Sequence, residues 1–465
     1  MFDDPNLVSS AGLVPLLALA DRAGLRELVE EHLTVPTDKG ANAGLKVASL
    51  VAGMLSGADS IDDMAVLRHG GMGRLFASAY APSTLGSFLR TFAFGHIRQL
   101  DAVASRFLLA LAKLTGLVAA TAAPALERAR EYALVDVDDT VVEVHGHAKQ
   151  GAGFGYNRIR GLNALLATLT TGSGTSGPVI VAQRLRKGAC NSSRGAKRLV
   201  ADATKTARRL LGRDHPVLVR MDSAFYGRGP VHAALSGGAA VSVTVRMNAQ
   251  IRAAIASIGD QAWTSIEYTD AIYEEATGRW ISRAEVAEIP FVAFAAQKKV
   301  EQVPGRLVVR RIPDFNAEDH RAAGQDALFD LWRFHAFFTT AEPDTLDTVA
   351  ADKTHRGHAI IEQVHADLKS SALAHLPSGV FTANAAWLVL AVIAFNLTRA
   401  AGTLAAPELA RATTATVRRK LIAIPARVAT SARRVTLHLP RNWPWETAWS
   451  QLITQVTDPP PPAAP

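Results

Sequence analysis

The sequence has a single cysteine, Cys190, among its 465 residues. One thiol excludes an intramolecular disulfide and any zinc site built from several cysteines. Long apolar runs are also missing: the most apolar stretch, residues 385–395, is too short to span a bilayer, so we expect a buried core helix and no membrane partner. The acidic, polar start MFDDPNLVSS is unlike a secretory signal. These features predict a cytoplasmic protein.

Positive charge is in modest excess, with 50 Lys and Arg against 42 Asp and Glu and a net charge of +8. This balance favours a polyanionic partner such as DNA. The basic residues cluster, for example at Lys205, Arg208 and Arg209 on one expected helix. Such clusters neutralise phosphates without reading sequence, although a solvated surface is the alternative for any one residue.

The spacing of apolar residues changes along the chain and predicts five segments. Residues 1–128 show helical spacing, which predicts an all-α, DNA-binding N-terminal domain. Residues 129–248 predict strand, strand, strand, helix, strand, which is the order of a ribonuclease H-like sheet whose fourth strand lies beside its first. Residues 249–345 indicate a β-rich insertion, and 346–402 a helical remainder of the core. Residues 403–465 form a basic segment with a disordered, Pro-rich tail.

The fold class expected from this order is α/β, with a mixed sheet flanked by helices. Its first strand, YALVDVDDTVVEV, carries three aspartates within an apolar run. Asp136 and Asp138 are two residues apart, so their side chains project from one face of a strand. Asp222 ends the fourth strand, VLVRMD, and meets Asp138 if the two strands are neighbours.

Converging carboxylates repel one another, and a divalent cation stabilises such a site. Oxygen ligands of this kind favour Mg²⁺ or Mn²⁺. We expect Asp138 to be the ligand from the first strand, with Asp136 or Asp139 as alternatives.

A third acid is offered by the stretch THRGHAIIEQVHADLKS. Placed on one helix, it separates an apolar stripe from a polar face that holds His355, His358, Glu362, His365 and Lys369. An amphipathic surface helix gives the same pattern. A zinc hydrolase would also place histidines around a glutamate, but the i,i+4 histidine pair of that motif is missing. Together with Glu362, Asp138 and Asp222 form the three-carboxylate layout of two-metal phosphoryl transfer. In that layout two ions roughly 3.5–4 Å apart clamp the attacking and leaving oxygens.

The motifs VDVDDT, VLVRMDSAFYG and HRGHAIIEQVHADLKSSALAHLPSGVF occur in this order along the chain. Together they resemble the DDE transposases of bacterial insertion sequences, in particular an actinobacterial-type branch numbered thirteen-eighty. The resemblance implies that Asp138, Asp222 and Glu362 are the catalytic and metal-binding acids, with two Mg²⁺ or Mn²⁺ ions as cofactors.

Related transposases that cut through a hairpin intermediate place a Tyr, an Arg, the Glu and a Lys on the last helix. Here Lys369 keeps its spacing from Glu362, whereas His355 stands in place of the Tyr and His358 in place of the Arg, with Arg356 nearby. The resemblance therefore implies DNA-phosphate contacts from Lys369, Arg356 and His358, and leaves open whether a hairpin forms.

The activity implied by the resemblance is cleavage at the ends of an insertion sequence, followed by transfer of the freed 3′-hydroxyl to target DNA. The implied partners are double-stranded terminal inverted repeats and target DNA, bound by a homodimer or a larger assembly. A Trp of the insertion, which could be Trp263, Trp280 or Trp332, would stack on a flipped base. Two alternatives remain: a catalytically inactive or domesticated DNA-binding protein of the same fold, and a structure-selective nuclease.

Overall fold

The fold is that of a computed structural model, which describes residues 1–36, 38–76, 79–118, 132–146, 148–155, 158–171, 176–274, 279–313, 332–431 and 434–457. Within these ranges, residues 267–274, 279–283 and 313 are described by their backbone alone. The expected boundary between residues 128 and 129 and the Pro-rich tail from residue 458 lie outside the described residues.

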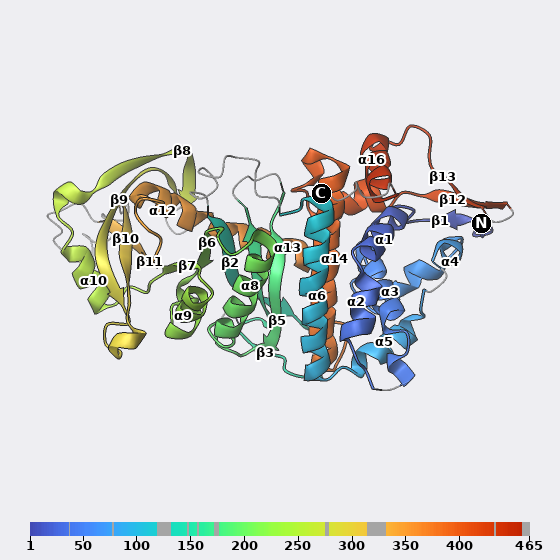
Figure 1. The fold of residues 1–465 in the computed structure, drawn as a ribbon, viewed down its shortest axis with the longest axis horizontal. Helices are drawn as coiled ribbons and strands as arrows, with labels where there is room; N and C mark the ends of the chain where they lie inside the picture. The colour runs from blue at the N-terminus through green and yellow to red at the C-terminus, as the bar shows by residue number, and fades with distance from the viewer. Residues whose placement is uncertain are drawn as a thin grey trace.

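A large mixed sheet runs through the middle of the molecule (Figure 1). Ten strands form it within the described residues: β2 (Ala133–Glu143), β3 (Gly153–Phe154), β4 (Arg160–Thr170), β5 (Val179–Lys187), β6 (Val217–Met221), β7 (Ala240–Thr244), β8 (Thr264–Glu274), β9 (Arg279–Ala293), β10 (Val303–Pro313) and β11 (Trp332–Thr339). Their order is β4, β2, β6, β7, β11, β10, β9, β8, with β3 and β5 both pairing with β4. The chain is thus mixed α/β, compatible with the ribonuclease H-like arrangement expected.

The fourth strand of the core does lie beside the first. Strands β2 and β6 pair in parallel, with Val135 opposite Val219 and Val137 opposite Met221. Both strands are rich in valine and largely buried, as is typical of parallel strands with helices on both faces. One further step of the register leads to Asp138 on β2 and Asp222 just beyond β6.

The strands expected between residues 249 and 345 continue the core sheet. Strand β11 pairs with β7, with Phe338 opposite Val243, and β10, β9 and β8 follow outward. A helix that the sequence did not indicate, α10 (Ala249–Ala256), precedes them. The sheet therefore passes without a break from the core into the strands of the insertion.

The N-terminal helices are α1 (Leu13–Arg22), α2 (Leu25–His32), α3 (Ala43–Ser56), α4 (Met72–Leu75), α5 (Pro82–Arg90) and α6 (Phe94–Thr115). Of these, α1 to α5 lie at the opposite end of the molecule from β8, and α6 lies nearer the middle, beside α14, Phe381–Ala405 (Figure 1). A short strand, β1 (Leu7–Val8), pairs with β12 (Ala426–Ser431), which forms a hairpin with β13 (Arg434–His438). Because β1 pairs with the C-terminal part, residues 1–128 are tied to it, and their standing as a separate all-α domain stays a prediction.

The remaining helices either connect strands of the sheet along the chain or follow its last strand, β11. They are α8 (Ala196–Leu211), α9 (Arg228–Ser236), α12 (Thr348–Arg356), α13 (Ile360–Lys369), α14 (Phe381–Ala405), α15 (Thr414–Val417) and α16 (Glu446–Thr457). Helix α14 contains the apolar stretch 385–395 and packs against α6, α3 and β5. Of the described helices it alone is long and apolar enough to cross a bilayer, yet 89% of its most apolar window is buried inside the protein. It is the central core helix.

Candidate functional site

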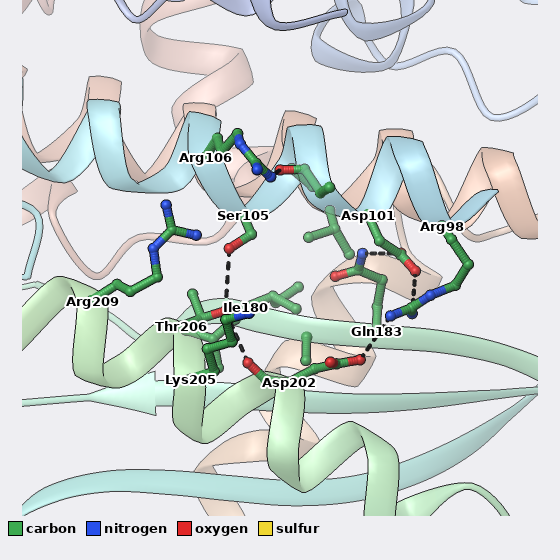
Figure 2. A pocket seen from close by; sticks show the side chains of 15 residues that line it. Arg98, Asp101, Ser105, Arg106, Ile180, Gln183, Asp202, Lys205, Thr206 and Arg209 are labelled. Carbon is green, nitrogen blue, oxygen red and sulfur yellow. Dashed lines mark hydrogen bonds and ion pairs between the residues drawn. The ribbon is translucent and has the colours of Figure 1, made fainter. Parts of the chain in front are cut away.

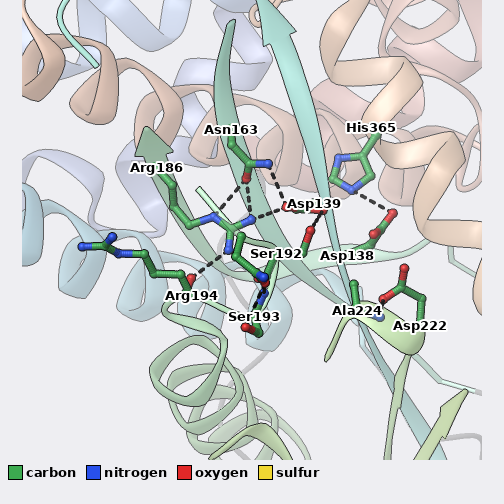
Figure 3. A network of polar contacts seen from close by, with 11 residues as sticks. Asp138, Asp139, Asn163, Arg186, Ser192, Ser193, Arg194, Asp222, Ala224 and His365 are labelled. Carbon is green, nitrogen blue, oxygen red and sulfur yellow. Dashed lines mark hydrogen bonds and ion pairs between the residues drawn. The ribbon is translucent and has the colours of Figure 1, made fainter. Parts of the chain in front are cut away.

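Two acidic side chains meet where β2 and β6 run side by side. Asp138 lies on β2, and Asp222 follows β6, where its carboxylate accepts a hydrogen bond of 2.9 Å from the backbone N–H of Ala224. Figure 3 shows both carboxylates on the same side of β2, with His365 next to Asp138. The sequence prediction that Asp138 and Asp222 come together is thereby met in the fold.

Ionisation is unfavourable for both aspartates, as their raised pKa values show. Burial raises the pKa of Asp138 to about 7, and the neighbouring charges of Asp222 and Asp139 add to this shift. The backbone N–H of Asp139 and the imidazole of His358 act against it. Burial also raises the pKa of Asp222. Two half-buried carboxylates that disfavour each other's ionisation favour a cation between them.

Asp136 has a different role, because it is fully buried and held by an arginine. The Nε and Nη2 atoms of Arg220 each donate to one carboxylate oxygen at 2.7 Å. His358 adds a third contact, with its Nδ1 at 2.8 Å from Oδ1 of Asp136. Arg220 also donates to the backbone carbonyl of Thr354. Asp136 thus joins β2, β6 and the segment that leads into α13.

Asp139 projects from the other face of β2. Its carboxylate is ion-paired with Arg186 and accepts hydrogen bonds from Nδ2 of Asn163 at 2.7 Å and from Ser192 at 3.3 Å (Figure 3). The two alternatives to Asp138 are therefore both engaged by arginines. Within the described residues, Asp138 is the aspartate of this run that no arginine or lysine pairs with.

The late helix does not form as one continuous α-helix. Helix α12 ends at Arg356, a 3₁₀ turn covers Gly357–Ala359, and α13 begins at Ile360. Three residues turn by about 60° more in a 3₁₀ helix than in an α-helix, so side chains before the turn face a different way from those after it. The expected single polar face over residues 355–369 is therefore wrong for its first part.

His355 lies on that separate face and is buried. Its ring stacks on Phe337, with centroids 4.1 Å apart and planes at 7°, and its nitrogens bond the hydroxyls of Ser242 (2.8 Å) and Thr244 (2.9 Å). Burial, with the charges of His358, Arg220 and Arg310, lowers the pKa of His355 to about 3. It is a neutral residue that fixes α12 to β7 and β11.

Two polar residues of α13, His365 and Lys369, lie next to β2. The Nε2 atom of His365 lies 3.7 Å from Oδ2 of Asp138, and Nζ of Lys369 is 3.4 Å from the hydroxyl of Thr140. Burial lowers the pKa of His365 to about 4, with Lys369 and His358 adding to the shift, so this ring is neutral near pH 7. His358, His365 and Lys369 thus line the approach to the acids.

The last two predicted site residues are Glu362 and Arg356, whose surroundings differ from those of His365 and Lys369. Glu362 is exposed on the first turn of α13. No three His, Cys, Asp or Glu side chains of the described residues lie close enough together to share one metal ion. Arg356 pairs with Asp352 through its Nε at 2.9 Å. The third carboxylate and the phosphate contact of Arg356 stay predictions.

The donor atoms around Asp138 and Asp222 suit a hard divalent cation. Carboxylate oxygens are the ligands that Mg²⁺ and Mn²⁺ prefer. Both ring nitrogens of the buried His365 have no hydrogen-bond partner in the described part of the chain. An ion with its bound waters would supply the positive charge that the acids lack and partners for these nitrogens. The residues present therefore fit such an ion, and Glu362 stays the predicted ligand from α13.

Several residues of the site were not singled out from the sequence. Arg220, Arg186 and Asn163 organise the acids. Arg220 and Asn163 each lie inside a largely apolar strand, whereas Arg186 lies in the basic end of β5. A charged residue in the middle of a buried strand needs a partner of opposite charge, and Arg220 in VLVRMD gave that signal.

The tryptophans of the insertion contact a cation. The guanidinium carbon of Arg311 lies 4.1 Å from the ring centroid of Trp263 and 4.4 Å from that of Trp332. The side chain of Trp280 lies outside the described residues. Which tryptophan, if any, stacks on a base stays open.

The chain was also compared with known proteins. A family model described as transposase DDE domain group 1 matches residues 1–460. No curated protein matches the chain.

Proposed function

The chain belongs to the DDE transposase family, and from this membership and its paired aspartates we propose that it cuts DNA at the ends of an insertion sequence and transfers the freed 3′-hydroxyl to target DNA. The observation that carries the proposal is the meeting of Asp138 and Asp222 on neighbouring parallel strands, with raised pKa values. The motifs quoted above favour the branch numbered thirteen-eighty.

We assign the metal-binding role to Asp138, Asp222 and Glu362. Two Mg²⁺ or Mn²⁺ ions bound there would activate the attacking water or 3′-hydroxyl and stabilise the departing oxygen. The chain itself contributes rigid placement, because Arg220 fixes Asp136 two residues from Asp138 and Asp139 is fixed by Arg186. Glu362 joins the other acids through a change of its side-chain conformation or a small movement of α13.

The DNA strand to be cut would approach along α13. Lys369 is exposed beside Thr140, and His358 and Arg356 lie at the start of the same segment. We propose that these three contact phosphates on either side of the bond that is broken. The larger assembly would be a homodimer or higher oligomer in the cytoplasm, associated with the nucleoid, with the N-terminal helices recognising the terminal repeats. In this scheme residues 1–128, 129–248, 249–345, 346–402 and 403–465 keep the roles expected from the sequence.

The test is cleavage of DNA that carries the ends of the element, in Mg²⁺ or Mn²⁺. Asp222→Asn should lower the cleavage rate about 100-fold or more, because several kcal/mol of charge stabilisation are lost. The matched control is Asp214→Asn, an exposed aspartate just before β6, which should cleave like the wild type.

Equal cleavage by Asp222→Asn and the wild type would remove the catalytic assignment. A wild-type protein that binds the ends but never cuts them would support the inactive DNA-binding alternative. Cutting without any joining would support the nuclease.

A further inference from the structure

A cavity lies away from the acids, between α6 and α8 beside the edge strand β5. It encloses about 180 Å³ (Figure 2). At one end its charges are balanced. Arg98 pairs with Asp101 at 2.8 Å, and Arg184 pairs with Asp202 at 2.6 Å. These ion pairs join α6, α8 and β5, and the charges at this end of the cavity sum to zero.

The other end of the cavity holds cations without acids. Arg106 from α6 and Lys205 and Arg209 from α8 line it, next to the hydroxyls of Ser105 and Thr206, which lie 3.2 Å apart. In the described part of the chain, Arg106 contacts the backbone carbonyl of Ala102 at 3.2 Å, and no acid pairs with Lys205 or Arg209.

The arrangement of these cations is unfavourable by itself. Lys205 and Arg209 are four residues apart on α8, and like charges at this spacing destabilise a helix. Arg106 brings a third positive charge from the facing helix. An anion bound in the groove would relieve the repulsion. The Thr206 hydroxyl donates to the backbone carbonyl of Asp202 at 3.0 Å, and the neighbouring Ser105 hydroxyl can donate to an oxygen of the anion. This chemistry matches a phosphate group.

We propose that Arg106, Lys205 and Arg209 bind a phosphate of the DNA backbone, outside the site of chemistry. The inference rests on the proposed function, because it names a further DNA-contacting surface of a transposase. It would add affinity without reading sequence, since phosphate contacts are the same for every base pair.

The groove is connected through α8 to the strand that carries the acids. The segment leading into α8 lies on the face of β2 opposite Asp138, where Arg186 pairs with Asp139 and also donates to the backbone carbonyl of Arg194. At about 1.5 Å per residue, Arg209 lies roughly 20 Å along α8 from Ala196. One turn of duplex DNA spans about 34 Å. The part of α8 between Ala196 and Arg209 is thus shorter than one turn of duplex DNA.

The test compares two double variants of equal charge change. Lys205→Gln/Arg209→Gln removes the groove cations, and Lys298→Gln/Lys299→Gln removes two exposed lysines of the turn before β10. Affinity for end DNA is measured from low to high salt. The groove variant should bind on the order of tenfold more weakly at low salt, and its slope of log affinity against log salt should be smaller by about 2. The control should keep the wild-type slope and the wild-type cleavage rate.

The outcomes separate this proposal from the function on which it rests. A wild type that does not bind end DNA would overturn both. Wild-type binding with an unchanged slope in the groove variant would overturn the groove alone. Thermal unfolding with inorganic phosphate is the second arm. If phosphate stabilises the wild type and not the groove variant, while their DNA affinities are equal, the groove takes a free anion and the DNA proposal is overturned.

Discussion

At the scale of single residues, three aspartates within four positions of β2 have three different environments. Asp136 is buried against Arg220, Asp139 is paired with Arg186 on the opposite face, and Asp138 faces Asp222. The alternation of side chains along a strand accounts for the two faces. It does not distinguish Asp136 from Asp138, which share a face. That distinction comes from β6, where Arg220 lies opposite Asp136 in the register.

The raised pKa of Asp138 predicts how stability depends on pH without metal. The pKa lies near 7 in the folded protein against 3.8 for an ordinary aspartate, because the carboxylate is buried. At Asp138 the folded state therefore binds more protons than the unfolded chain between about pH 4 and 7, so the contribution of this group to the free energy of unfolding falls as pH rises through the window. The buried, neutral His355 and His365, whose pKa values are lowered, contribute the opposite slope below about pH 6.5 and do so equally in the wild type and in a variant at position 138. Asp138→Asn should remove the contribution of Asp138 and raise the free energy of unfolding at pH 8 by on the order of 2 kcal/mol.

Urea denaturation in EDTA at pH 5 and pH 8 measures both quantities. Asp214→Asn serves as the control and should follow the wild type at both values. A variant with Asn at position 138 that keeps the full wild-type pH dependence would contradict the burial of an unpaired carboxylate at this position.

At the scale of elements, the site depends on contacts between segments far apart in the chain. His355 fixes α12 to β7 and β11, and Arg220 joins β6 to the backbone at Thr354. Helix α14 supports β5 in a similar way. Asn396 accepts a hydrogen bond from the backbone N–H of Ile180 and donates one to its carbonyl, each at 2.9 Å. The Asn396 side chain thus supplies hydrogen-bond partners for the backbone of β5, which pairs only with β4 in the described sheet.

Asn396→Ala should lower the free energy of unfolding by about 2–4 kcal/mol, because two buried backbone groups lose their partner. Urea denaturation near neutral pH measures the change. Thr403→Ala is the control, since that hydroxyl bonds the carbonyl of Arg399 within the same helix. A loss no larger in Asn396→Ala than in Thr403→Ala would show that α14 does not support the edge strand in this way.

At the scale of the whole molecule, the sequence predicted the order of the core strands and the meeting of Asp138 and Asp222. Those predictions succeeded because apolar runs, turn residues and acids at strand ends are local signals. The pairing of β1 with β12 and of β11 with β7 was not predicted, because register between distant segments is decided by tertiary partners. The 3₁₀ turn at Gly357–Ala359 was missed because three residues are too short a stretch for a change of helical period to show in the spacing of apolar residues.

The central claim is that acids far apart in the chain share divalent ions. Anomalous scattering from Mn²⁺, in crystals of the protein bound to its end DNA, tests it most directly. The account predicts manganese between the carboxylates of Asp138 and Asp222, with an oxygen of Glu362 completing the coordination. Manganese bound elsewhere, or a peak beside one of these aspartates that the other does not touch, would contradict it.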